Sequence, residues 1–334
     1  MVSDEGVLLI PSASYFWHKK MKVLKPLLHC GIKGMRRHSL TLPVTALPAS
    51  PLVAFNASGN SLQTGLTHLF RRKSDIDRSP AASFRSLCRS GKFGGQTSGS
   101  VPGFVQANFV AVHQEHAFNF LRFCLLNPRA CPLLDVTAPG DSVPHTLAPG
   151  ADVRSDLPKY LVWKDGEVVE ERSDVADMWG HDTVGFLLGC SFSWEQLLVD
   201  AGLPPRHMEQ GCNVPMYRTS VSNTRVGPFG GHLVVSMRPY SPRKLGLVRE
   251  ITSRYPGAHG GPIHWGDPSA IGVCIDGEPD FGDKVVVRDD EVPVFWACGV
   301  TPQEALRAAR LPFAITHAPG HMFVADLVDS ELEV

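Results

Sequence analysis

The sequence lacks several features that would assign it to a class at once. Its 334 residues contain no run of about 18 apolar residues, which argues against a membrane-spanning helix. Its 32 Lys and Arg nearly balance 33 Asp and Glu, so a net charge of −1 offers no basic field to nucleic acid phosphates or an anionic membrane. The eight cysteines include no CxxC pair, which is typical of reduced thiols rather than of a zinc ribbon or a disulfide scaffold. We therefore expect neither nucleic acid nor membrane as a partner.

The charge is unevenly distributed along the chain. Residues 1–74 carry ten Lys and Arg and two acids, a net charge of +8, while residues 75–334 carry −9. The segment from Met35 to Ser74 has no acid and is rich in Ser and Thr, which is typical of a mitochondrial transit peptide. We therefore predict an extension over 1–74 that directs the protein to the mitochondrial matrix. The alternatives are a disordered tail, or translation that starts at Met21 or Met35. In either case the protein would be cytoplasmic.

The rest of the chain reads as alternating strands and helices. The apolar run 104–113 predicts a buried strand, and the helical spacing after it ends at Asn127-Pro128. Asp165-Gly166 predicts the turn of a hairpin. Further strands are expected within 182–190, 214–221, 232–239, 284–287, 292–298 and 313–327, and helices within 80–92, 193–203, 242–255 and 301–311. This mixture favours an α/β fold of layered sheets and helices.

One pattern occurs twice, at an offset of 108 residues. VGFLLGCSFSWEQLL and VPVFWACGVTPQEAL each place an apolar strand before a Cys, a hydroxyl residue three positions later, and a helix. The hydroxyl residues, Ser193 and Thr301, are predicted N-caps, because Gln196 and Glu304 stand three positions further on. We interpret the two segments as equivalent strand-to-helix turns, and such turns commonly hold ligands in α/β proteins.

A series of ordered motifs covers most of residues 84–327. They are GFVQAN (103–108), NPRACPLL (127–134), DVRSDLPKY (152–160), GCSFSWE (189–195), NVPMYRT (213–219), VVSMRP (234–239), HGGPIHWGDP (259–268), PDFGD (279–283), EVPVFWACGVTPQ (291–303) and THAPGHM (316–322). In these motifs the chain resembles a family of hydro-lyases that includes D-glutamate cyclase.

The resemblance implies a two-domain α/β fold, in which a three-layer αβα domain accompanies a smaller two-layer α+β domain. We expect the smaller domain to be inserted, as residues 191–298, into a main domain of residues 75–190 and 299–334. The activity that the resemblance implies is the loss of water from D-glutamate to give 5-oxo-D-proline, without an obligate metal or another cofactor.

Cyclising glutamate requires a clamp for the α-carboxylate, a base for the amine, and donors for the oxyanion. Arg suits the clamp, because its planar fork binds a carboxylate through two hydrogen bonds. Three arginines lie in the motifs, namely Arg154, Arg218 and Arg238. Each could instead form a structural ion pair.

The first turn, at Cys190, Ser191 and Ser193, is the predicted oxyanion site, because the N–H groups at a helix N-terminus bind anions. Ser193 could serve as a cap, as a substrate-binding residue, or as both. Cys190 and Cys298 could act as nucleophiles or pack as buried thiols.

The histidines offer the base. His264, which Asp267 could orient, and His317 are the predicted acid/base residues, because a neutral imidazole accepts a proton near pH 7. The pairs His259–His264 and His317–His321 also have a spacing that would permit a metal site. Neither pair resembles HExxH, so no metal is expected.

The sequence therefore predicts a lyase that eliminates water from a small amino or hydroxy dicarboxylate, its expected small-molecule partner, with D-glutamate as the best candidate. A small-carboxylate binding protein without turnover is one alternative. A metal-dependent hydrolase that uses the His pairs is another. The sequence does not distinguish a monomer from a homo-oligomer.

Overall fold

We describe residues 72–334 of a computed structural model. The transit-peptide prediction falls on residues 1–74 and therefore lies almost wholly outside the described residues. Residues 72 and 73 already contact the folded part, since the Lys73 N–H donates to the Glu331 carboxylate over 2.6 Å. Within the described range, no helix is both long and apolar enough to cross a membrane.

The larger sheet has seven strands and is antiparallel throughout its pairings. Its order is β2-β5-β1-β10-β3-β4, with β11 also paired to β1. The strands are β1 (Phe104–His113), β2 (Leu133–Val136), β3 (Tyr160–Lys164), β4 (Glu167–Arg172), β5 (Thr183–Gly189), β10 (Ala314–His317) and β11 (Phe323–Val328). Along one edge of β1, β10 pairs with residues 110–112 and β11 with residues 104–107. Between these two ladders, β1 leaves a short gap that becomes part of the site.

The smaller sheet has four antiparallel strands in the order β6-β7-β9-β8. They are β6 (Met216–Ser222), β7 (His232–Tyr240), β8 (His264–Trp265) and β9 (Val292–Ala297). All four lie within 191–298, the segment predicted to be an inserted domain. The hydrophobic cores nevertheless run through both sheets, and the division into two domains stays a prediction.

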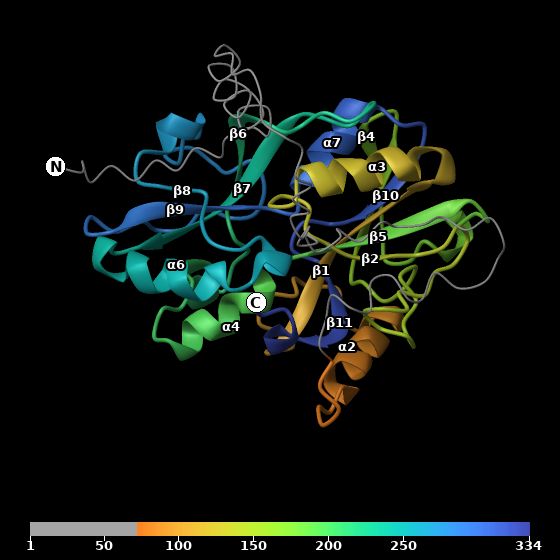
Figure 1. Ribbon diagram of the computed structural model, residues 1–334, viewed down its shortest axis with the longest axis horizontal. Helices are drawn as coiled ribbons and strands as arrows, with labels where there is room; N and C mark the ends of the chain where they lie inside the picture. Colours follow the sequence, from red (N-terminus) through yellow and green to blue (C-terminus); the bar gives the residue numbers. More distant parts are fainter. Residues whose placement is uncertain (1–71) are drawn as a thin grey trace, which may run out of the picture. The chain divides into compact units, whose positions relative to one another are not determined.

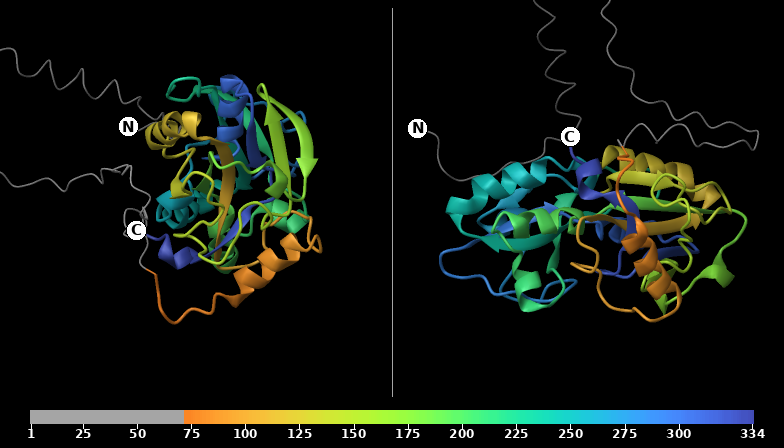
Figure 2. Two further views of the ribbon diagram at one scale, coloured as in Figure 1. Left: turned by 90° about the vertical axis from the view of Figure 1, so that its right-hand side faces the viewer. Right: turned by 90° about the horizontal axis from the view of Figure 1, so that it is seen from below.

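Helices cover both faces of the sheets, as Figure 1 shows. They are α2 (Ser79–Arg89), α3 (Gln114–Leu126), α4 (Phe192–Asp200), α5 (Arg206–Gln210), α6 (Leu245–Ser253) and α7 (Thr301–Ala309). Short 3₁₀ turns cover Ala176–Met178, Pro242–Lys244, Pro256–Ala258, Pro268–Ile271 and Asp329–Glu331. Helix α2 packs against β11, and it can be followed in Figure 2 as the helix next to the start of the described chain.

The alternation of side chains along β1 explains the layers. Val110 and Val112 enter the core that α3 and α7 share, while Phe109 and Ala111 enter the core on the other face, with Trp194 of α4. Strand β9 alternates in the same way between the two cores. The two sheets therefore form a middle layer between helices, and the predicted α/β class is confirmed.

Two local predictions have clear outcomes. The hairpin at Asp165-Gly166 is confirmed: β3 and β4 flank it, and both residues have positive φ, 52° and 85°. The strand predicted at 284–287 is wrong, because this segment pairs with no neighbour and Val286 is 55% exposed. An apolar run without a partner strand does not form a ladder. Strands β2 and β8 were not predicted, since each is too short to show a period.

Candidate functional site

The repeated pattern forms two equivalent turns, one leading from β5 into α4 and the other from β9 into α7. In the first, the Cys190 N–H donates to the carbonyl of Gln106 on β1 over 3.1 Å. In the second, the Cys298 N–H donates to the carbonyl of Val234 on β7 over 3.0 Å. The offset of 108 residues therefore marks a true structural equivalence, with one turn on each sheet.

The predicted N-caps are wrong, because both hydroxyls bond to the neighbouring strand. Ser193 Oγ accepts from the Gln106 N–H over 3.0 Å and lies 3.2 Å from the Gln106 carbonyl. Thr301 Oγ1 lies 3.0 Å and 3.3 Å from the same groups of Val234. The N-cap positions belong to Ser191 and Val300, and neither side chain caps the helix. Each hydroxyl instead fastens the first helical turn to a strand.

A cavity lies between the two turns, so that the N-termini of α4 and α7 both border it. Its lining includes Cys190, Ser191 and Phe192 from one turn, and Cys298, Gly299 and Val300 from the other. The remaining lining residues are Asn108, Val214, Met216, His259, His317, Gly320 and Met322. The lining contains no carboxylate, Lys or Arg among the described residues. Its polar groups are thus neutral side chains and helix N-termini.

Two features fix the position of His259 in the cavity wall: an unusual backbone conformation, and a contact between its ring and a backbone carbonyl. Its φ of 73° is uncommon for a residue other than glycine, and such conformations concentrate at functional sites. The imidazole Nδ1 lies 2.8 Å from the carbonyl oxygen of Arg129. Burial lowers the pKa of His259 to about 4, so the ring is neutral at physiological pH. The sequence suggested His259 only as one member of the His259–His264 pair and assigned the acid/base role to His264 instead.

His317 fills the gap between β10 and β11 along β1. Its Nδ1 lies 3.1 Å from both the amide nitrogen and the carbonyl oxygen of Phe109. Its Nε2 is buried and has no hydrogen-bond partner among residues 72–334. Burial lowers the pKa of His317 to about 4, which again keeps the ring neutral. The sequence predicted this residue as acid/base, and the structure places it in the cavity lining.

Asn108 lies directly against the second turn. Its Nδ2 donates to the carbonyls of Gly189 over 2.8 Å and Leu188 over 3.3 Å. Because carbonyls only accept, these partners fix the orientation of the amide and make Oδ1 its accepting end. A Cβ on Gly299 would lie 1.9 Å from Nδ2, so only glycine permits this approach. Sequence reasoning missed both residues, although they lie in the GFVQAN and EVPVFWACGVTPQ motifs.

Arg238 stands behind the first turn rather than in the cavity lining. It is fully buried, its Nη2 lies 2.5 Å from Glu195 Oε1, and Nη2 also donates to Ser191 Oγ over 2.9 Å. Burial alone would raise the pKa of Glu195, but nearby His207 and Arg238 outweigh it and bring the pKa to about 2. Arg238 can only donate, so Ser191 accepts from it and keeps its own proton for another partner.

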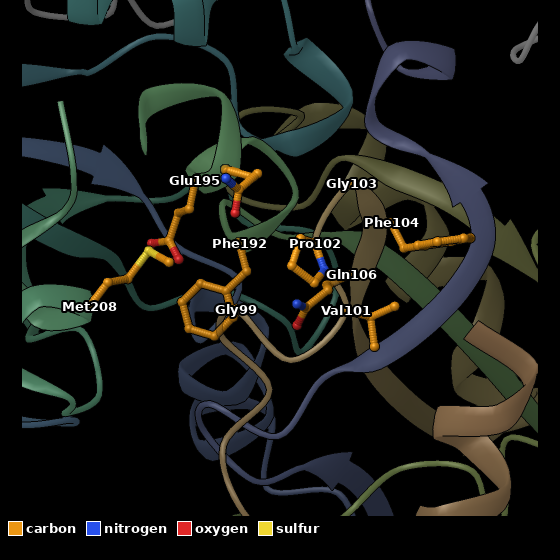
Figure 3. A pocket seen from close by; sticks show the side chains of 10 residues that line it. Gly99, Val101, Pro102, Gly103, Phe104, Gln106, Phe192, Glu195 and Met208 are labelled. Carbon is orange, nitrogen blue, oxygen red and sulfur yellow. The ribbon is translucent and has the colours of Figure 1, made fainter. Parts of the chain in front are cut away.

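Phe192 also lines a second hollow, together with Gln106, Glu195 and Met208 (Figure 3). Ser98 Oγ donates to Glu195 Oε2 there over 2.9 Å. His207 Nε2 lies 3.1 Å from the other carboxylate oxygen. The carboxylate is therefore surrounded by donors, which fixes α4 and the turn that precedes it.

The two cysteines of the turns are protonated thiols. Burial raises the pKa of both, that of Cys298 to about 11, although backbone N–H groups of the following residues act in the opposite direction. Neutral thiols are poor nucleophiles, so this geometry favours the packed-thiol alternative over covalent catalysis.

The other two arginines of the sequence prediction form ion pairs outside the cavity lining. Arg154 pairs with Asp152 over 2.7 Å. Arg218 pairs with Asp280 over 2.7 Å and with Glu304 over 2.8 Å. Both guanidinium groups therefore have carboxylate partners within the protein.

His264 and Asp267 also lie apart from the cavity lining. The Nε2 of His264 lies 2.6 Å from the backbone carbonyl of Asp267. The Asp267 carboxylate instead accepts from the N–H and hydroxyl of Ser269. The orienting role predicted for the carboxylate thus falls to its backbone. In the part of the chain that the structure describes, no three His, Cys, Asp or Glu side chains converge as a metal site would need.

The structure therefore brings together four of the predicted site residues. Three of them line the cavity, namely Cys190, Ser191 and His317, and Ser193 lies in the first turn of α4 beside it. Arg238 supports that turn from behind. Arg154, Arg218, His264 and Asp267 lie elsewhere.

Comparison with known proteins identifies the family. A family described as D-glutamate cyclase matches residues 184–326. A "Putative hydro-lyase" of Rubrobacter xylanophilus is 53% identical over 254 residues, covering 76% of this chain and 98% of that protein. One of Geobacillus kaustophilus is 51% identical over 250 residues, covering 75% and 95%. A nitrogen repressor-like protein of Methanococcus jannaschii covers 70% of this chain and 90% of its own, at a TM-score of 0.32 and 10% identity, too low to bear on the fold.

These matches support the activity of a hydro-lyase, an enzyme that removes water from its substrate. With such identity over nearly the full length of its relatives, the chain belongs to the D-glutamate cyclase family.

Proposed function

We propose that the cavity between the two turns removes water from a small amino dicarboxylate, with D-glutamate to 5-oxo-D-proline as the best candidate. The observation that carries this proposal is the position of two helix N-termini and two neutral imidazoles around one cavity. Helix N-termini favour bound carboxylates, and a dicarboxylate has one for each. The lining also contains no acidic side chain that would repel a bound carboxylate.

The reaction balances within the substrate itself. The amine nitrogen forms a bond to the side-chain carboxyl carbon, and one carbon–oxygen bond breaks. Two protons leave the ammonium group and join the departing oxygen as water. The protein has to accept and return protons and to stabilise an oxyanion, for which neutral imidazoles, the Ser191 hydroxyl and the α4 N-terminus are suitable groups.

The direct test is proton NMR of the full chain with D-glutamate, L-glutamate and hydroxy dicarboxylates. Formation of 5-oxo-D-proline from D-glutamate supports the proposal, and product from another dicarboxylate moves the substrate within the same class. A dicarboxylate that raises the melting temperature and stays chemically unchanged contradicts turnover and indicates a binding protein. A substrate turned over only with added metal, and not after chelation, would favour the hydrolase alternative.

Ser191→Ala is expected to lower kcat about 100-fold with a smaller effect on KM. Arg238 leaves the Ser191 proton free for the oxyanion, and the loss of one such donor costs about 10²- to 10³-fold in kcat. The measurement is steady-state dehydration by the variant. Ser90→Ala, which removes an exposed hydroxyl bonded to the Leu87 carbonyl, is the control and should retain full activity.

Gly299→Ala is expected to lower kcat/KM about 100-fold. The added Cβ would overlap the Asn108 amide, so the amide or the second turn must move, and a shift of about 1 Å in a site can cost this much. Gly246→Ala is the matched control, since a Cβ there meets nothing within 4 Å. Equal activity of the two variants in the same assay would contradict a role for the close contact.

A further inference from the structure

The two imidazoles of the cavity differ in their tautomer. In each ring, the backbone groups next to Nδ1 determine which nitrogen carries the proton. A neutral histidine has one N–H donor and one acceptor nitrogen, and the partner of Nδ1 determines what Nε2 can do. Nδ1 of His259 lies next to a carbonyl, whereas Nδ1 of His317 lies equally near an amide N–H and a carbonyl. This difference bears directly on the chemistry available inside the cavity.

At His259 the partner of Nδ1 is a carbonyl. The carbonyl oxygen of Arg129, 2.8 Å away, can only accept, so Nδ1 carries the proton. The ring is neutral, and Nε2 therefore has a lone pair. Residues flanking the ring keep it in place, because Ala258 is fully buried and Gly260 has the positive φ, 66°, that the following turn requires.

At His317 the decisive partner of Nδ1 is an amide. The N–H of Phe109 donates to Nδ1 over 3.1 Å, at a point where β1 has left its ladder with β11 and has not begun that with β10. A buried N–H without an acceptor is rarer and more costly than a carbonyl that lacks one donor. The N–H of Phe109 therefore claims Nδ1 as acceptor, although the Phe109 carbonyl lies equally near. The proton of the neutral ring then resides on Nε2.

We propose that His259 and His317 form a pair of opposed tautomers, in which Nε2 of His259 accepts a proton and Nε2–H of His317 donates a hydrogen bond to the developing oxyanion. The buried and unpartnered Nε2 of His317 is the observation that points to a ligand, since such an atom is costly unless something occupies the cavity. This assignment of roles rests on the proposed function.

In this scheme His259 carries the two protons that leave the substrate nitrogen, one after the other, to the departing oxygen, so the ring ends the cycle neutral. His317 keeps its proton and stabilises negative charge. The carboxylates of the substrate enter a cavity without charged side chains, so they raise the proton affinity of His259 at the moment of reaction. The same charges strengthen the hydrogen bond from His317.

The test is ¹⁵N NMR of the full chain labelled at histidine, which reports the protonated nitrogen of each neutral ring. The variants His259→Gln and His317→Gln assign the signals by removing one ring each. We expect a protonated Nδ1 at His259 and a protonated Nε2 at His317 at pH 7. The same tautomer at both residues, or the reverse pair, would overturn the inference whatever the enzyme turns over.

Activity provides an independent readout. The amide of His317→Gln retains an N–H donor near the position of Nε2, so this variant should keep more activity than His317→Leu, which we expect to lose about 100-fold. His259→Gln cannot take up a proton and should lose about 10²- to 10⁴-fold. Equal losses in His317→Gln and His317→Leu would contradict the donor role. A wild-type chain that turns over none of the dicarboxylates would refute the proposed function and leave the tautomers testable.

Discussion

Arg238→Met is expected to lower the free energy of unfolding by about 3–5 kcal/mol, the cost of breaking a buried ion pair by removing one partner. Glu195 is 1% exposed, and its Oε1 lies 2.5 Å from Arg238 Nη2. Without the guanidinium group, the negative charge of this buried carboxylate has fewer partners to stabilise it, so the pKa of Glu195 rises. Trp194 and Trp296 also lose the cation that lies 4.7 Å and 5.4 Å from their rings.

Urea unfolding of the full chain measures this effect, and the chain provides a matched control. Arg218→Met removes a guanidinium group that also has carboxylate partners but is 37% exposed, so it should cost about 1 kcal/mol or less. The double variant Arg238→Met/Glu195→Gln should recover part of the loss, because it no longer buries an unpaired charge. Similar losses of unfolding free energy in both single variants would show that the burial of Arg238 does not increase the cost of removing it.

Stability is expected to fall as the pH drops from about 6.5 toward 4, by about 2 kcal/mol for each of His259 and His317 by pH 5. Burial lowers both pKa values to about 4 in the folded chain, from 6.5 in the unfolded chain. In this window the unfolded chain binds more protons, so stability is fully present above pH 6.5 and is lost on acidification. The carboxylate of Glu195, with a pKa of about 2, adds its loss only below about pH 4.5.

Urea unfolding between pH 7 and pH 5 tests this expectation. His317→Gln and His259→Gln should each reduce the slope of stability against pH, whatever they do to stability at pH 7. A slope unchanged in both variants would mean that other groups cause the acid sensitivity. The two effects should add, because the rings are neutral and hydrogen bond to different backbone segments.

The sequence predicted what depends on local pattern. The hairpin at Asp165-Gly166 requires positive φ, which Gly and Asp adopt readily, and the repeated Cys turns share a strand, a spacing and a helix. Both therefore appeared in the structure as expected. The family resemblance placed His317 and Ser191 in motifs, and the structure shows them around one cavity.

The sequence could not show which residues far apart along the chain contact one another. Ser193 satisfied the local rule for a capping residue, but its hydroxyl bonds to Gln106, 87 positions away. The arginines satisfied the rule for a carboxylate clamp, but Arg218 has Glu304, 86 positions away, as its carboxylate partner. The sequence paired His259 with His264, but its ring contacts the Arg129 carbonyl, 130 positions away. In each case tertiary contacts decide between roles that the residue type leaves open.

The two equivalent turns are attached to the protein by separate sets of bonds. Each turn is fastened to its own sheet by its own backbone and hydroxyl bonds, through Ser193 to β1 and through Thr301 to β7. Asn108 links the two turns, because its amide donates to Gly189 and Leu188 before the first turn and lies against Gly299 in the second. A substitution that leaves Asn108 in place can therefore change the shape of one turn while the other turn keeps its attachment to its own sheet.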